Sequence, residues 1–321
     1  MALLVVPLLA LLASLLILSD INGVYGGRSI FMEEDLEFER QLKQLNKPSI
    51  KSIKMSSSIP KATFKEASSS GVKHVDLRLQ GGGCPSGTVP IRKTTKEDLI
   101  RWKSFSNSSG NIHQFLDEGP GKHVHPKLYG DNKTHTFGHW TADGSQKTGC
   151  FNALCNGFVQ VSKSSPLGLA FPFTSTTGGA ILQLPLFLFQ NIHSNNWWLG
   201  YGEGDHFVDI GYWPPELFNG IKDSAPIVGW RGEAYAPQGE LYPQMGTGNL
   251  PSRFKGSRQS KITAYFRAVR VYNESYIGVG PYDRSLQSVT DSPYCFYVFD
   301  YPYIDDYWRH VFFYGGPGGK C

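Results

Sequence analysis

The sequence predicts an all-β protein, a sandwich of two antiparallel sheets that follows a small region of mostly helical or disordered character. Aromatic residues make up 13% of the 321 residues, and 36 glycines with 20 prolines favour many turns over long helices. Short apolar runs separated by Gly, Pro, Asn and Asp fill the C-terminal half of the chain. Two of these runs, FVQV and AYFRAVRV, alternate in the manner of strands with one buried face.

The first element, residues 1–26, is predicted to be a signal peptide. Leu3 to Leu18 is an unbroken apolar run, long enough for the core of a signal and short for a membrane span. A signal anchor is the alternative interpretation. No second apolar span follows, so we expect no membrane partner once the signal is removed.

Two helices and a linker are expected next. The run at 29–45 (SIFMEEDLEFERQLKQL) predicts a charged helix, which the following Lys-Pro pair ends. Residues 51–83 are rich in Ser, Lys and Gly and predict a flexible linker. The sequence TTKEDLIRW then predicts a second helix, capped by Thr94 or Thr95.

Several later runs predict strands separated by turn residues. One short helix, with proline in its first turn, is expected at 214–221 (PPELFNGI). The predicted strands are GFVQVS (157–162), LGLAFPF (167–173), AILQLPLFLFQ (180–190), NWWLGYG (196–202), PIVGWRGEAY (226–235), ITAYFRAVRVY (262–272) and HVFFYGG (310–316).

The five cysteines suggest two disulfides, which a secreted protein permits. Cys150 and Cys155 bracket one short loop, and Cys295 and Cys321 bracket the last segment, so these local pairs are the simplest pairing. Cys84 is left over. Three Asn-x-Ser/Thr sequons also fit passage through the secretory route, and they lie at Asn107, Asn132 and Asn273.

Composition argues against several classes of partner. The net charge is only +4 and no basic block is interleaved with aromatic residues, so nucleic acid is not expected. The Gly200-x-Gly202-x-Gly204 run lacks the context of a phosphate loop, and no cofactor is predicted. His123 and His125 would share one strand face as a metal pair, but no third ligand has suitable spacing, so no metal site is predicted.

Glu233 is the most informative single residue. Its carboxyl follows GWRG and precedes AY, within an apolar and aromatic strand-like run. Such surroundings remove water from a carboxyl group, favour its neutral form and suit it to proton transfer. The alternative is a strand residue that faces water.

An ordered set of motifs resembles the plant neprosin family. The matching pieces are the N-terminal charged helix, CPSGTVPIRKTTKEDL, VHPKLYGDN, TADGSQKTGCFNALCNGFVQ, NWWL, GYWPPELF, GWRGEAY, QMGTG and the closing FFYGGPGGKC. Together they cover well over half the chain. The resemblance implies a secreted precursor in three parts: a signal at 1–26, an activation region at 27–106, and a β-sandwich peptidase domain at 107–321.

The family resemblance also implies two catalytic glutamates and cleavage after proline. Glu233 falls in the motif that carries the second of them. Relatives usually have a second glycine where this chain has Arg231. A cation two positions away along a strand shares the face of Glu233 and favours its ionised form.

Glu118 is the candidate for the first catalytic glutamate. It lies in DEGPGKHV, close to the place the family pattern predicts, but one residue is inserted and a tryptophan is absent. The chain also passes almost directly from LIRWKSFSNSSGN to this motif. Several N-terminal strands of the domain are therefore expected to be missing, which would expose a sheet edge or force rearrangement.

Aromatic side chains near Glu233 are candidates for substrate binding or for core packing. A groove lined by such rings would bind the faces of proline or sugar, and the candidates are Trp198, Tyr212, Trp213 and Trp230. The resulting hypothesis is a secreted glutamic endopeptidase of the cell wall or apoplast that acts on proline-containing peptides. The rival is a catalytically impaired β-sandwich that binds cell-wall protein or carbohydrate.

Overall fold

The structure is a computed structural model, and the chain divides into two compact units. The residues it describes are 32–46, 55–57, 72–107, 129–144, 148–202, 206–234, 236, 239–253, 257–281 and 286–321. The predicted signal peptide lies outside them.

The smaller unit contains a helix at residues 32–45 and the start of helix α2 (Lys96–Asn107). Thr95 caps α2 as expected: its hydroxyl accepts from the Asp98 N–H at 3.2 Å, and the Asp98 carboxylate accepts from the Thr95 N–H at 2.9 Å. The Asn46 side chain donates to the Thr94 carbonyl at 2.9 Å and accepts from the Thr94 N–H at 3.0 Å. These reciprocal bonds fix the end of the first helix to the start of α2.

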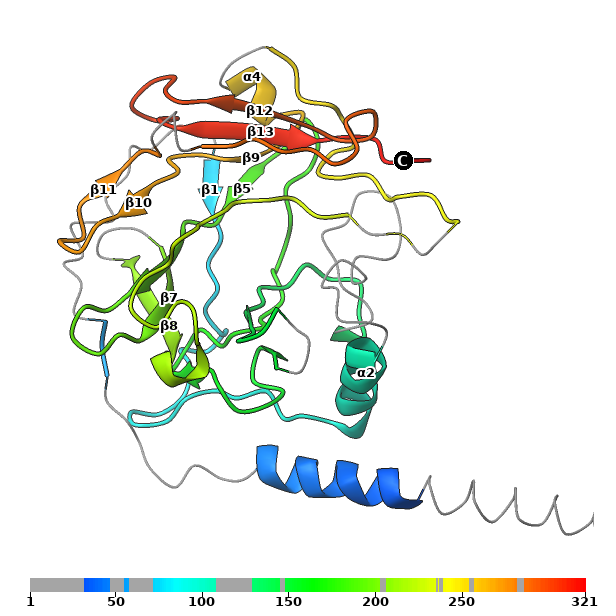
Figure 1. The fold of residues 1–321 in the computed structure, drawn as a ribbon, viewed down its shortest axis with the longest axis vertical. Coiled ribbons are helices and arrows are strands. Elements are labelled where there is room, and N and C mark those ends of the chain that lie inside the picture. Colours follow the sequence, from blue (N-terminus) through cyan, green and yellow to red (C-terminus); the bar gives the residue numbers. More distant parts are fainter. Residues whose placement is uncertain are drawn as a thin grey trace, which may run out of the picture. The chain divides into compact units, whose positions relative to one another are not determined.

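The larger unit is built from strands, which confirms the all-β prediction (Figure 1). Its largest sheet is antiparallel with strand order β4-β8-β7-β6, and a second antiparallel sheet has the order β12-β13-β9. The strands of these two sheets are β4 (Val159–Gln160), β6 (Leu186–Gln190), β7 (Trp197–Tyr201), β8 (Val208–Trp213), β9 (Ala264–Phe266), β12 (Tyr297–Tyr301) and β13 (Val311–Gly315).

Smaller elements complete this unit. Three two-stranded sheets pair β1 with β5, β2 with β3, and β10 with β11, and only the first of these described pairs is parallel. Their bounds are β1 (Val72–His74), β2 (His139–Trp140), β3 (Cys150–Phe151), β5 (Ile181–Gln183), β10 (Val271–Tyr272) and β11 (Gly278–Val279). Two short helices are the 3₁₀ helix η4 (Pro215–Leu217), at the predicted place, and α4 (Ser257–Ser260).

The four-stranded sheet carries a core on each face. Trp197, Leu199 and Tyr201 of β7 belong to one cluster, whereas Trp198 lies in a second cluster with Tyr212. Adjacent residues of a strand point to opposite faces, so this sheet is buried on both sides. That arrangement explains why β7 reads as a continuous apolar run rather than an alternating one.

The linker prediction is wrong for residues 72–83. β1 pairs with β5 through Val72 and Ile181, and the following residues Val75 and Leu77 are 4% and 2% exposed within the main core. Farther along, the Leu79 N–H donates to the Ser164 carbonyl at 2.7 Å. Apolar residues at every second position from Val75 to Leu79 supply the burial that a Ser- and Gly-rich linker lacks.

Four predicted strands differ from the structure. LGLAFPF forms only an isolated bridge between Ala170 and His135, and AILQLPLFLFQ is divided into β5 and β6. The 226–234 part of PIVGWRGEAY is extended but pairs with no strand among the described residues. ITAYFRAVRVY is split into β9 and β10, because Ala268 takes a left-handed φ of 51° that ends the ladder. β8 and β12 were not among the predicted strands.

Candidate functional site

Residues 227–230 line a large groove of the β unit, and Glu233 follows three residues later without itself lining the groove. The groove has a volume of about 2030 Å³, and Trp230 and Tyr314 are among the residues that line it. Leu182 and Leu188 line it from β5 and β6, and Phe266 lines it from β9. Trp230 therefore lines a groove, and its assignment to substrate binding stays a prediction.

Gly232 allows this segment to approach β13 closely. A Cβ atom at position 232 would lie 2.5 Å from the Tyr314 ring and 2.6 Å from the Met245 sulfur. Only glycine fits such a contact without moving its neighbours. Gly232 is thus packed directly on Tyr314. This contact fixes the backbone position from which the Glu233 side chain extends.

Three separate motifs meet at this point. Met245, from QMGTG, exchanges backbone hydrogen bonds of 2.9 and 3.2 Å with Gly316, from the closing FFYGGPGGKC. Gly232, from GWRGEAY, packs on Met245 and on Tyr314 of the closing motif. Two neighbouring motifs and the closing motif, which begins more than 60 residues later, therefore build one small region around Glu233.

Glu233 is paired with Arg231, as the two-residue spacing predicts. Arg231 Nε lies 2.6 Å from Glu233 Oε1, with 65% of the arginine side chain and 23% of the glutamate side chain exposed. Oε1 is buried, and among the described residues it accepts no aligned hydrogen bond. The contact is therefore an ion pair whose N–H is directed away from the oxygen.

Tyr314 is a groove residue that sequence reasoning missed. Its ring stacks on Phe266, with centroids 5.4 Å apart and planes 22° apart. Burial raises the pKa of Tyr314 to about 12, so its hydroxyl keeps its proton at acidic and neutral pH. The alternation of HVFFYGG predicts that Tyr314 and Phe312 share one face of the strand. It does not predict that this face lies next to the segment that carries Glu233.

A polar cluster lies on the other face of the β12-β13-β9 sheet. Gln183 Nε2 donates to the hydroxyls of Tyr265 and Tyr307 at 2.6 and 3.0 Å, and its Oε1 accepts from Arg267 Nε at 3.0 Å. Burial raises the pKa of Tyr265 to about 12. Because Tyr265 and Phe266 are adjacent on β9, this cluster and Glu233 approach the sheet from opposite sides.

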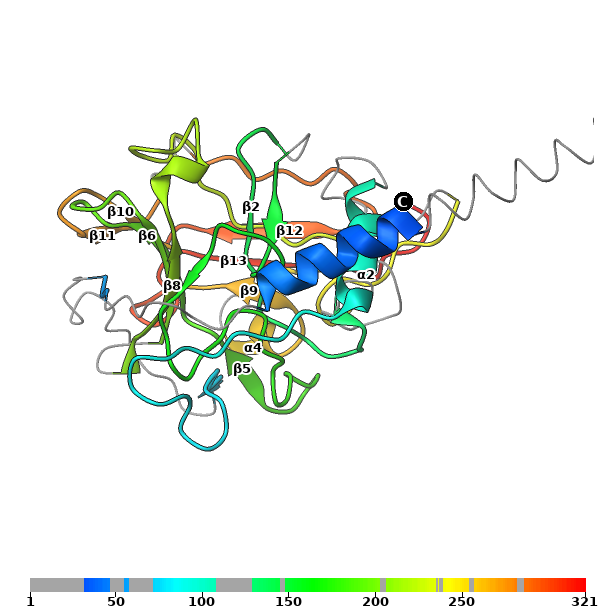
Figure 2. The same cartoon turned by 90° about the horizontal axis from the view of Figure 1, so that it is seen from below.

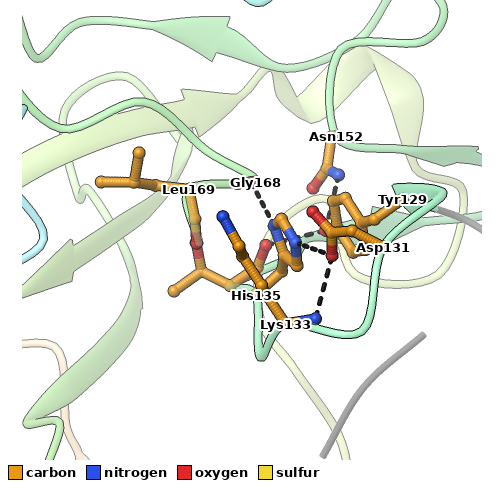
Figure 3. A network of polar contacts seen from close by, with 8 residues as sticks. Tyr129, Asp131, Lys133, His135, Asn152, Gly168 and Leu169 are labelled. Atoms are coloured by element: carbon orange, nitrogen blue, oxygen red, sulfur yellow. Dashed lines mark hydrogen bonds and ion pairs between the residues drawn. The ribbon is translucent and has the colours of Figure 1, made fainter. Parts of the chain in front are cut away.

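A second polar network surrounds His135 (Figure 3). His135 Nδ1 contacts the Gly168 carbonyl and Nε2 contacts Asp131 Oδ1, both at 2.9 Å. The imidazole is stacked flat on Tyr129, with centroids 3.8 Å apart, and Asn152 Nδ2 donates to the Tyr129 hydroxyl at 2.9 Å. Both ring nitrogens therefore face oxygen atoms that accept hydrogen bonds.

This network connects two loops. The Asn152 side chain accepts from the Gly138 N–H at 3.0 Å, and Asn152 lies inside the loop closed by the Cys150–Cys155 disulfide. Burial raises the pKa of Tyr129 above its ordinary value. The loop that carries the Asn132 sequon is therefore fixed to the disulfide loop.

The predicted disulfides are present, joining Cys150 to Cys155 and Cys295 to Cys321. Cys84 is free and partly exposed. Among the sequons, Asn132 and Asn273 are exposed, and Asn107 is the last residue of α2.

The other predicted site residues are distributed unevenly. Trp198 is fully buried and Tyr212 is 6% exposed, so both take the core role that the sequence left open. Trp213 is also 6% exposed and only borders the groove. Glu118, His123 and His125 lie outside the described residues, so the distance between Glu118 and Glu233 is not defined.

None of the helices formed by the described residues is both long and apolar enough to cross a membrane. Within the same part of the chain, no three His, Cys, Asp or Glu side chains are grouped to hold a metal ion.

Residues 106–317 match the family described as Neprosin. The chain belongs to the neprosin family. The match includes Glu233, GWRGEAY, QMGTG and the closing motif as far as Pro317. It begins after β1, Val75 and Leu77, although these residues are built into the core of the neprosin domain.

Proposed function

We propose that this neprosin-family protein is a secreted glutamic endopeptidase that hydrolyses proline-containing peptides, preferentially after proline. Glu233 is one catalytic carboxylate and Glu118 is the other. The observation that supports this proposal best is the position of Glu233. Glu233 follows Gly232, which packs on Tyr314, and both Trp230 and Tyr314 line a groove large enough for an extended peptide.

Two carboxyl groups are sufficient for this chemistry. The ionised one takes a proton from a bound water as that water attacks the peptide carbonyl. The protonated one hydrogen-bonds to the carbonyl oxygen and then gives its proton to the leaving nitrogen. When two carboxyl groups share a site, repulsion between their charges moves their pKa values apart. One group is then the base and the other is the acid.

Secretion is part of the same proposal. Two disulfides suit an oxidising compartment. The apolar run at Leu3 to Leu18 and the exposed sequons at Asn132 and Asn273 agree with passage through the secretory route. The cell wall or apoplast is the destination we propose.

The test is incubation of the acid-treated protein with a fluorescent proline-containing peptide, and identification of the products by mass spectrometry. We expect cleavage on the carboxyl side of proline, and its loss in Glu233→Gln and in Glu118→Gln. Glu240→Gln is the matched control, because Glu240 is an exposed carboxylate close in the sequence. Absent cleavage, or cleavage that is equal in all variants, would reject the mechanism.

The contact between Arg231 and Glu233 favours one alternative. A carboxylate with a cation 2.6 Å away is less available as a base, so the second candidate is a β protein that binds cell-wall protein or carbohydrate without cleaving it. Equal binding of a proline-rich peptide or an oligosaccharide by the wild type and Glu233→Gln, with no products, would support this alternative.

A further inference from the structure

The outer edge of β6 is exposed, apolar and without a partner strand in the described part of the chain. β6 is the last strand of the order β4-β8-β7-β6. Its residues Leu186 and Leu188 are 55% and 60% exposed. No charged residue and no proline lies between Leu186 and Gln190, so the strand lacks the features that usually protect an edge.

The hydrogen-bond pattern shows which backbone groups point outward. The Asn191 N–H donates to the Asn196 carbonyl at 2.9 Å, and the Gly202 N–H donates to the Pro185 carbonyl at 3.0 Å. Bonded pairs alternate along an antiparallel ladder. Phe187 and Phe189 therefore bond to β7, while the N–H and C=O groups of Leu186 and Leu188 are directed away from the sheet.

Tyr276 marks where this free edge ends. Its hydroxyl donates to the Gln190 carbonyl at 3.3 Å and accepts from the Ile192 N–H at 3.0 Å. Figure 2 shows the β10–β11 ribbon, which flanks Tyr276, next to β6. The unoccupied stretch is thus Leu186 to Leu188, with one outward-facing residue on each side of Phe187.

The same stretch continues a core face that is not fully covered. Leu188 is opposite Leu199, which is 6% exposed and belongs to the main cluster. Leu186 and Leu188 line the groove that also reaches Trp230 and Tyr314. An added strand would therefore gain backbone hydrogen bonds and bury leucine side chains at the same time.

We propose that the outer edge of β6 binds an extended, uncharged peptide segment, which joins the sheet as a fifth strand beside Leu186 and Leu188. The proposal deepens the proposed function, because the groove leads from this edge to the residues beside Glu233. A peptide is the occupant favoured here because the free ladder is short and open at the groove. Proline is excluded from the two pairing positions, since it lacks the N–H, but not from residues farther along the groove.

The test is binding of a labelled octapeptide of alternating valine and threonine, measured by fluorescence anisotropy. The Glu233→Gln protein is used, so that cleavage does not interfere. Strand pairing is tested with a set of peptides that each carry one N-methyl group, placed at a different position in each peptide. The N-methyl group removes the backbone N–H at that position. We expect N-methylation to weaken binding by roughly threefold to tenfold at alternate positions, and to have little effect between them.

Protein variants locate the site. Leu188→Lys and Leu186→Lys are expected to weaken binding by about tenfold, since each replaces an apolar contact at the edge by a charge. Both leucines are exposed, so the fold tolerates lysine, and circular dichroism melting verifies this. Leu241→Lys is the control, because Leu241 is 70% exposed and does not line the groove.

The outcomes separate this proposal from the catalytic one. Binding that is absent, insensitive to the alternation of N-methyl groups, or equal in Leu188→Lys and Leu241→Lys overturns the β6 site even if the enzyme cleaves peptides. Dimerisation without peptide, abolished by Leu188→Lys in sedimentation, also overturns it, because a second copy would then be the occupant. Alternating sensitivity in a protein that cleaves nothing leaves the β6 site supported and the peptidase proposal rejected.

Discussion

Arg231 Nε lies 2.6 Å from Glu233 Oε1, although the two residues are separated by only one glycine in an extended segment. Their side chains share a face because alternate residues of an extended chain point the same way. Gly232 points the other way, onto Tyr314. The local backbone thus fixes both the ion pair and the site at which a catalytic base is proposed.

Replacing Arg231 with glycine is expected to increase the proposed peptidase activity. The ion pair stabilises the resting carboxylate, so its removal makes proton transfer from water easier. Because the arginine is largely exposed to solvent, the pair is worth up to about 1 kcal/mol, which corresponds to roughly a fivefold rise in kcat/KM. The measurement is the hydrolysis of a proline-containing peptide, with Arg253→Gly as an exposed control. A lower rate in Arg231→Gly would instead show that the arginine orients Glu233.

Replacing Asp131 with asparagine is expected to reduce stability in a pH-dependent way. Although burial opposes it, hydrogen bonds from the Lys133 N–H and the His135 ring hold the pKa of Asp131 below its ordinary value. A carboxyl with a lowered folded-state pKa stabilises the fold above its unfolded value of about 4. This contribution is lost as the pH falls through the folded-state pKa.

Urea unfolding measures this effect. Because Asp131 is 39% exposed, we expect the variant to lose about 1 kcal/mol at pH 6. Below the folded-state pKa the two proteins should converge. Asp291→Asn, at an exposed position, serves as the control. An equal loss at pH 6 and at low pH would show that the effect is not electrostatic.

Truncating Leu77 to alanine is expected to destabilise the β unit. Leu77 is 2% exposed in the main core, and removal of such a side chain costs about 2–5 kcal/mol. Ile91→Ala removes an aliphatic side chain that is 59% exposed and should change the free energy of unfolding by less than about 1 kcal/mol. Similar unfolding midpoints for the two variants would place residues 72–79 outside the core.

The two disulfides should contribute unequally to stability. Cys295 and Cys321 are 26 residues apart, whereas Cys150 and Cys155 are 5 apart. Loop-closure entropy predicts about 3.5 kcal/mol for the longer loop and about 2 kcal/mol for the shorter one. Thermal unfolding of the two double serine variants checks the order. A larger loss in Cys150→Ser/Cys155→Ser would point instead to the Asn152 contacts.

The sequence was informative where a local rule acts alone. Thr95 caps α2 because its hydroxyl meets the next free N–H groups, and this depends on neighbours within one turn. The Arg231–Glu233 contact follows in the same way from alternation. Both of these predictions need no knowledge of the rest of the fold.

The aromatic residues show where such rules are insufficient. Trp197 and Trp198 are adjacent on β7, so one groove is unable to use both rings. Which face is covered depends on strands that are distant in sequence, and the structure covers both. β1 was missed for a related reason: three residues paired with a distant strand leave a weak pattern inside a Ser-rich segment.

The placement of β1 also determines what a processed molecule would be. A cut between Asn107 and Tyr129 would not free the N-terminal piece, because β1 remains paired with β5, and Val75 and Leu77 remain in the core. The product would be a nicked two-chain particle. It would run as two bands on a denaturing gel and as a single peak in gel filtration.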